Sequence, residues 1–112
     1  MFKSTPEKPN PTLLAQTLYR AASILEELGW TNFNNPSKRG GIDALQAFRE
    51  AVDEQTRSKG LWFHGREALL SHLKLGEVSL GEWNDKQDAA VGSTIVVDAF
   101  RNTASKLQAS LS

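Results

Sequence analysis

The chain has 112 residues, with 13 basic and 13 acidic residues, a formal net charge of zero and no cysteine. This length allows one domain, and the missing cysteine excludes disulfides, a thiolate nucleophile and Cys-ligated metal sites. The chain lacks the basic excess that is typical of nucleic-acid-binding proteins, so we consider nucleic acid an unlikely partner. It has neither an apolar run long enough to span a membrane nor the apolar core of a signal peptide. We therefore expect a cytoplasmic protein without a membrane partner.

Prolines and charged residues dominate the N-terminal segment, which predicts a flexible tail over residues 1–10 and a single domain over residues 11–110. Asn10 and Pro11 are the residue types preferred at the cap and at the first position of a helix. From there, leucines and alanines recur every three or four residues, so we predict a helix over residues 11–28.

The first helix is expected to stop at Gly29, because glycine suits the left-handed position after a helix end. Trp30 follows and is placed to pack back on that helix. Residues 31–41 are rich in Asn and Gly and read as a loop. Apolar residues at helical spacing then predict a second helix over residues 42–56.

The densest aromatic stretch, residues 61–64, is too short and too irregular to be assigned to a helix or a strand. A third helix is predicted over residues 66–75, before a glycine. Ser79 and Glu82 have the spacing of a capping box, which predicts a single short helical turn carrying Trp83.

Ser93 is the predicted cap of the last helix. The β-branched run over residues 94–97 favours a strand locally, but no second strand is predicted to pair with it, and a lone strand leaves backbone groups unpaired. We therefore predict an all-α fold, a compact bundle of about four main helices plus one short helical turn.

Four segments occur in an order that matches a known pattern. They are Leu28-Gly29-Trp30-Thr31, Gly41-Ile42-Asp43-Ala44-Leu45, Ala68-Leu69-Leu70-Ser71-His72-Leu73 and Glu82-Trp83-Asn84-Asp85. Over about residues 14–107, the chain resembles a family of small proteins of actinobacteria and their phages, in which a Gly-Trp, a Gly-Ala-Leu and a Trp-Asn-Asp motif follow one another. The resemblance implies a helical fold and a phage origin, and it implies no particular reaction.

The chain departs from that family pattern at two places. Members often carry a cysteine just before the second helix, where this chain has Arg39, Gly40 and Gly41. Members also often carry acidic residues in the first turn of the last helix, where this chain has apolar side chains. Because this chain has no cysteine, it cannot carry out any thiol chemistry that the relatives perform.

The aromatic stretch is the preferred binding candidate, since Trp and other aromatic side chains supply much of the energy of protein interfaces. Its residues are Trp62, Phe63 and His64, with Arg66 beside them. The alternative is that the stretch crosses the core, because a small domain has few other places for three large side chains.

A second group has a structural interpretation. Trp30 and Trp83 are expected to pack in the core, while Asn84 or Asp85 accepts backbone N–H groups and holds the following loop. The functional alternative is a polar binding site beside a tryptophan wall.

A weak anion site is suggested by Lys38 and Arg39 beside Gly40 and Gly41 at the expected start of the second helix. A flexible glycine hinge is the competing interpretation. The two histidines stand eight residues apart, without the spacing of a helical metal pair, so we expect no metal and no cofactor.

The sequence contains no nucleophile elbow, phosphate-binding loop or dinucleotide fingerprint, so we expect no catalytic residues and no enzyme. The leading hypothesis is a non-enzymatic protein-binding module, a small phage-encoded accessory protein that acts on a host protein. The alternative is a DNA-binding regulator with a helix-turn-helix-like element. The oligomeric state is open, and a surface leucine stripe would support a homodimer.

Overall fold

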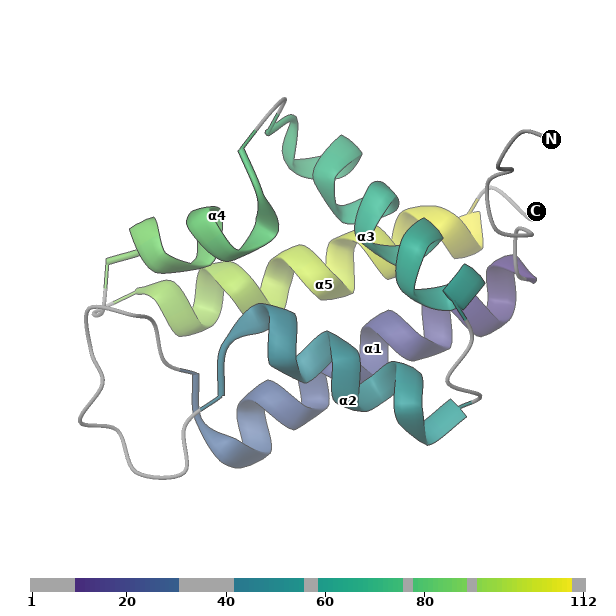
Figure 1. Ribbon diagram of the computed structural model, residues 1–112, viewed down its shortest axis with the longest axis horizontal. Helices are drawn as coiled ribbons and strands as arrows, with labels where there is room; N and C mark the ends of the chain where they lie inside the picture. Colours follow the sequence, from purple (N-terminus) through teal and green to yellow (C-terminus); the bar gives the residue numbers. More distant parts are fainter. Residues whose placement is uncertain (1–9, 31–41, 56–58, 76–77, 89–90, 110–112) are drawn as a thin grey trace, which may run out of the picture.

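The computed structural model describes residues 10–30, 42–55, 59–75, 78–88 and 91–109. Within these ranges the chain forms helices and no strand, apart from one isolated bridge between Trp30 and Ile42 (Figure 1). The helices are α1 (Pro11–Leu28), α2 (Ala44–Gln55), α3 (Lys59–Leu73), α4 (Leu80–Lys86) and α5 (Gly92–Ala109). The predicted all-α fold is confirmed, whereas nearly all of the predicted N-terminal tail and the loop over residues 31–41 lie outside the described residues.

The two longest helices, α1 and α5, pack side by side and run antiparallel (Figure 1). The end of α1 meets the start of α5, where the ring of Trp30 lies against Gly92. Helix α2 packs on α1, α3 packs on α5, and α4 lies against α2. The largest fully buried side chains come from all five helices and include Leu14, Leu18, Leu25, Phe48, Leu61, Leu69, Leu80, Val96 and Phe100.

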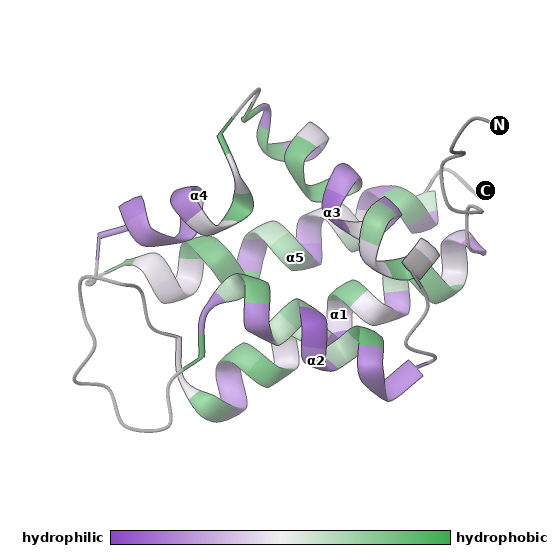
Figure 2. Ribbon diagram, viewed as in Figure 1, coloured by the Kyte–Doolittle hydropathy of each residue, from purple (hydrophilic) through white to green (hydrophobic). Residues whose placement is uncertain are grey.

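Each helix mixes hydrophobic and hydrophilic residues along its length (Figure 2). This mixture is what helices with one buried face and one wet face require. Among the described residues, no helix is both long and apolar enough to cross a membrane.

Helix α1 begins and ends where its sequence signals predict. The Asn10 side-chain oxygen accepts a hydrogen bond of 2.7 Å from the backbone N–H of Thr12, and Pro11 occupies the first helical position. Gly29 has φ 87°, a value that glycine adopts readily. Its ψ of 127° extends the chain onward, so that its carbonyl accepts a hydrogen bond of 2.8 Å from the N–H of Ile42.

The start of α4 carries its predicted capping box, whereas α5 begins before its predicted cap. The predicted capping box is confirmed, since the Ser79 hydroxyl accepts the Glu82 N–H at 3.1 Å and the Glu82 carboxylate accepts the Ser79 N–H at 3.4 Å. The element that follows is a seven-residue helix and not a single turn. Helix α5 starts at Gly92, before the predicted cap Ser93, and its β-branched run is helical as predicted.

The prediction of a third helix over residues 66–75 was wrong at its start, because α3 begins at Lys59 and includes the whole aromatic stretch. The stretch is short and irregular in sequence, and it lies between Gly60 and Gly65. Glycine inside a helix costs roughly 1 kcal/mol relative to alanine. Gly65 is accommodated inside α3 because a side chain from another helix packs closely against it. The Phe48 ring from α2 lies against its backbone, in the space that a Cβ would need.

We expect Gly65→Ala to destabilise the fold by about 1–3 kcal/mol, because the added methyl group would overlap the buried Phe48 ring. Urea unfolding followed by circular dichroism measures this change. Gly81→Ala is the matched control, since a Cβ at that position in α4 would meet only the Ser79 hydroxyl at an ordinary 4.0 Å, and helix propensity predicts a gain of up to about 1 kcal/mol. A Gly65→Ala protein as stable as the control would contradict this packing.

Candidate functional site

A buried asparagine joins three segments that are far apart in the sequence. The Asn84 side-chain oxygen accepts a hydrogen bond of 2.7 Å from the indole N–H of Trp30 and one of 3.0 Å from the backbone N–H of Ala44. Its amide nitrogen donates to the carboxylate of Asp85 at 3.3 Å. Asn84 is only 1% exposed, so both N–H groups that it accepts would otherwise be buried without a partner.

The predicted structural motif is therefore built from long-range contacts. Trp30 is buried, while Trp83 and Asp85 are half-buried, and Trp83 packs against the core. The sequence interpretation expected Asn84 or Asp85 to hold the loop that follows them. Instead, Asn84 caps the N-terminus of α2, where Asp43 also accepts the N–H of Gln46 at 2.7 Å.

The aromatic stretch is divided between the core and the surface by its helical geometry. Leu61 is fully buried, and the next three side chains are half-buried. Trp62 stacks on Phe48 with ring centroids 5.2 Å apart, and Phe63 meets His64 edge to face at 5.0 Å. The half-buried Trp62 packs against the core, while the binding role of the stretch stays a prediction.

Trp62 and Arg66 line a groove of about 280 Å³ between α3, the first turn of α2 and the start of α4. We call it the Trp62 groove. Its lining residues are Leu45, Trp62, Arg66, Ser79, Leu80 and Gly81. The groove thus has an apolar floor with one cationic side chain at its side.

The arginines beside Trp62 have no carboxylate at hydrogen-bonding distance among the described residues. The Arg49 guanidinium lies over the Trp62 ring, 5.4 Å from its centroid, and Arg66 lies 5.9 Å from the ring of Phe63. The nearest acidic contact of Arg66 is Glu67 at 4.0 Å, too long for a hydrogen bond. The buried Nε of Arg66 also lacks a hydrogen-bond partner in the described part of the chain.

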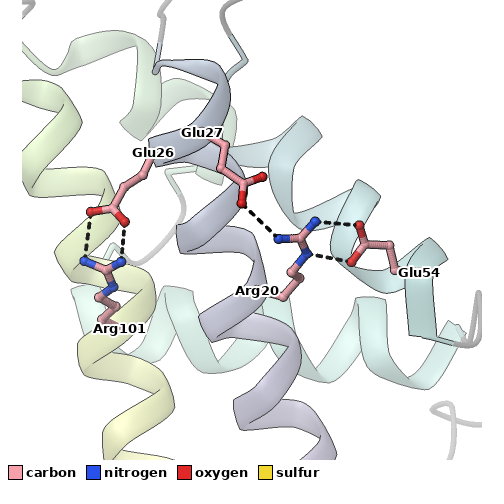
Figure 3. A network of polar contacts seen from close by, with 5 residues as sticks. All are labelled: Arg20, Glu26, Glu27, Glu54 and Arg101. Atoms are coloured by element: carbon pink, nitrogen blue, oxygen red, sulfur yellow. Dashed lines mark hydrogen bonds and ion pairs between the residues drawn. The ribbon is translucent and has the colours of Figure 1, made fainter.

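The other two described arginines are neutralised by glutamates (Figure 3). Arg20 of α1 donates to both carboxylate oxygens of Glu54 on α2, at 2.8 and 3.0 Å, and Arg101 of α5 makes the same kind of pair with Glu26. The hydrogen bonds from Arg20 lower the pKa of Glu54, and those from Arg101 lower the pKa of Glu26. By contrast, Arg49 and Arg66 beside Trp62 form no such two-bond pair with a carboxylate among the described residues.

Sequence reasoning found Trp62 and Arg66 but missed most of the groove around them. Leu45, Leu80 and Arg49 come from other helices, and their positions in the sequence carry no signal that they meet Trp62. The predicted anion-site residues Lys38, Arg39, Gly40 and Gly41 lie outside the described residues.

No group of three His, Asp or Glu side chains in the described ranges is arranged to hold a metal ion. Comparison with known proteins adds no assignment, since no family model, curated protein or solved structure matches this chain. The resemblance to the actinobacterial and phage family therefore stays a prediction.

We expect Asn84→Ala to destabilise the protein by about 3 kcal/mol, because it leaves the Trp30 indole N–H and the Ala44 N–H buried without an acceptor. Thermal and urea unfolding measure the loss, and the indole proton resonance of Trp30 reports the broken bond. Asp85→Ala is the control, since its contact with Asn84 is longer, at 3.3 Å, and partly exposed. An equal effect of the two variants would contradict the role given to Asn84.

Proposed function

We propose that this chain is a non-enzymatic protein-binding module. Its Trp62 groove receives a segment of a partner protein in which an apolar side chain stands beside a carboxylate. The observation that supports this most is the pair of guanidinium groups, Arg49 and Arg66, that donate no hydrogen bond to a carboxylate among the described residues and lie next to a half-buried tryptophan.

The aromatic part of the groove suits an apolar anchor. Trp62 is held by its stack on Phe48, so little side-chain freedom is lost when a partner covers it. Leu45 and Leu80 extend the apolar surface beside the ring. Trp and Arg are the residue types in which interface energy concentrates, and both are present here.

The charge of the groove suits a carboxylate. A planar guanidinium binds a carboxylate through two parallel hydrogen bonds, as Arg20 and Arg101 already do within the chain. The contact of Arg66 with Glu67, at 4.0 Å, is too long for a hydrogen bond, so the Arg66 guanidinium donates to no carboxylate among the described residues. An acidic residue of the partner would supply the carboxylate that accepts hydrogen bonds from Arg66.

The biological setting follows from the family resemblance. A small chain without catalytic signatures, similar to proteins of actinobacterial phages, fits an accessory protein that acts on a host protein. A tight binding surface of a few residues is enough for such a role, since a few residues carry most of the energy of an interface.

A displayed library of random peptides, selected on the purified protein, tests the groove. We expect enrichment of peptides with Asp or Glu next to Leu or an aromatic residue. The double variant Arg49→Ala, Arg66→Ala is expected to weaken a selected peptide about 30-fold, which corresponds to about 2 kcal/mol for a hot spot. Alanine at Trp62 and Phe63, with helicity intact by circular dichroism, should abolish binding.

The matched control is the double variant Arg20→Ala, Arg101→Ala, which removes the same two charges from the ion-paired face. It should bind the selected peptides like the unmodified protein, because exposed ion pairs contribute little to stability. Enriched peptides without acidic residues, or equal loss in both double variants, would exclude the Trp62 groove as the binding surface.

The alternative, a DNA-binding regulator, is less well supported by the charge distribution. Two of the four described arginines already bind glutamates, and affinity for DNA depends on cations that are free to replace phosphate counterions. We expect no retardation of duplex DNA in a gel-shift experiment at low salt. Retardation that disappears in the Arg49→Ala, Arg66→Ala variant would instead make nucleic acid the partner.

A further inference from the structure

A second groove lies between α3 and α5, apart from the Trp62 groove. It has a volume of about 290 Å³ and is lined by Ala68, Ser71, His72, Thr103, Lys106 and Leu107. This volume is at the small end of the range for ligand pockets in proteins. None of its lining residues belongs to the Trp62 groove, so the two surfaces are formed by different residues.

His72, one of the residues that line the groove, carries a polar atom for which the described residues supply no partner. His72 Nδ1 is shielded from solvent and has no hydrogen-bond partner among the described residues. Such orphaned atoms are rare in folded proteins and call for an explanation. Thr103 cannot supply a donor, because its hydroxyl already donates to the Ala99 carbonyl at 2.7 Å.

The charge around that atom is positive. Lys106 is the only charged residue lining the groove within the described part of the chain, and it has no ion pair there. Burial lowers the pKa of His72, and the positive charge of Lys106 lowers it further. An anion between the two side chains would offset both effects on the pKa of His72, since it would pair with the ammonium group and accept a hydrogen bond from the imidazole.

The rest of the lining is mixed, since Ala68 and Leu107 are apolar whereas Ser71 is an exposed polar residue. Ala68, Leu107 and the buried Thr103 surround the polar end. One cation favours one negative charge, and the apolar part of the lining favours a short hydrocarbon body over a fully hydrated ion such as phosphate. We propose that this groove binds a small organic monocarboxylate, with its carboxylate between Lys106 and His72 and its apolar body against Ala68 and Leu107.

Proton NMR of the two histidines tests this site, with sodium butyrate as the probe and sodium chloride at equal ionic strength as the reference. We expect butyrate to raise the pKa of His72 by about one unit in a saturable manner, because a bound carboxylate stabilises the imidazolium. His64, which lines neither groove, is the internal control and should not respond.

Lys106→Gln is expected to weaken butyrate binding about ten-fold, because it removes a charge-assisted hydrogen bond. Lys106 is exposed, so the substitution leaves the core intact, and Lys86→Gln on α4 is the matched control. A response of His72 that does not saturate, that is unchanged in Lys106→Gln, or that inorganic phosphate produces equally well would overturn the proposal. Peptide binding at the Trp62 groove is independent of each of these outcomes.

Discussion

One oxygen atom determines how the ends of the helices meet. The Asn84 side chain accepts N–H groups from Trp30, just after α1, and from Ala44, the first residue of α2. Because the site is buried, no water replaces these bonds if the geometry changes. The short helix α4 is thereby tied to two distant segments, although seven residues alone would not be stable as a helix in water.

The Trp62 groove depends on that tie. Leu80 and Gly81, in the first turn of α4, form one side of the groove, and Trp62 forms another. Trp62 itself stacks on Phe48, whose ring also lies against Gly65 on the next turn of α3. The surface offered to a partner is thus an extension of the core, and its shape is set before binding. Preorganisation of this kind lowers the entropy that an interface must lose.

How far the sequence predicts this molecule depends on the range of each interaction. The cap at Asn10, the capping box at Ser79 and the glycine after α1 lie within a few residues of what they determine, and all three were predicted. The start of α3 was missed, because Gly65 is favoured there by the Phe48 ring of α2, which packs against its backbone from a distant part of the sequence. Likewise, Trp62 and Arg66 were singled out, but Arg49 joins them only through tertiary packing.

The three tryptophans occupy three different environments, and this gives the protein built-in optical reporters. Trp30 is 5% exposed and its indole N–H is bonded to Asn84, so its emission reports on the integrity of the helix junction. Trp62 is half-buried beside an arginine, so its emission responds to anything that covers the groove. Replacing Trp83, the third, by phenylalanine would separate folding from binding in a single fluorescence titration.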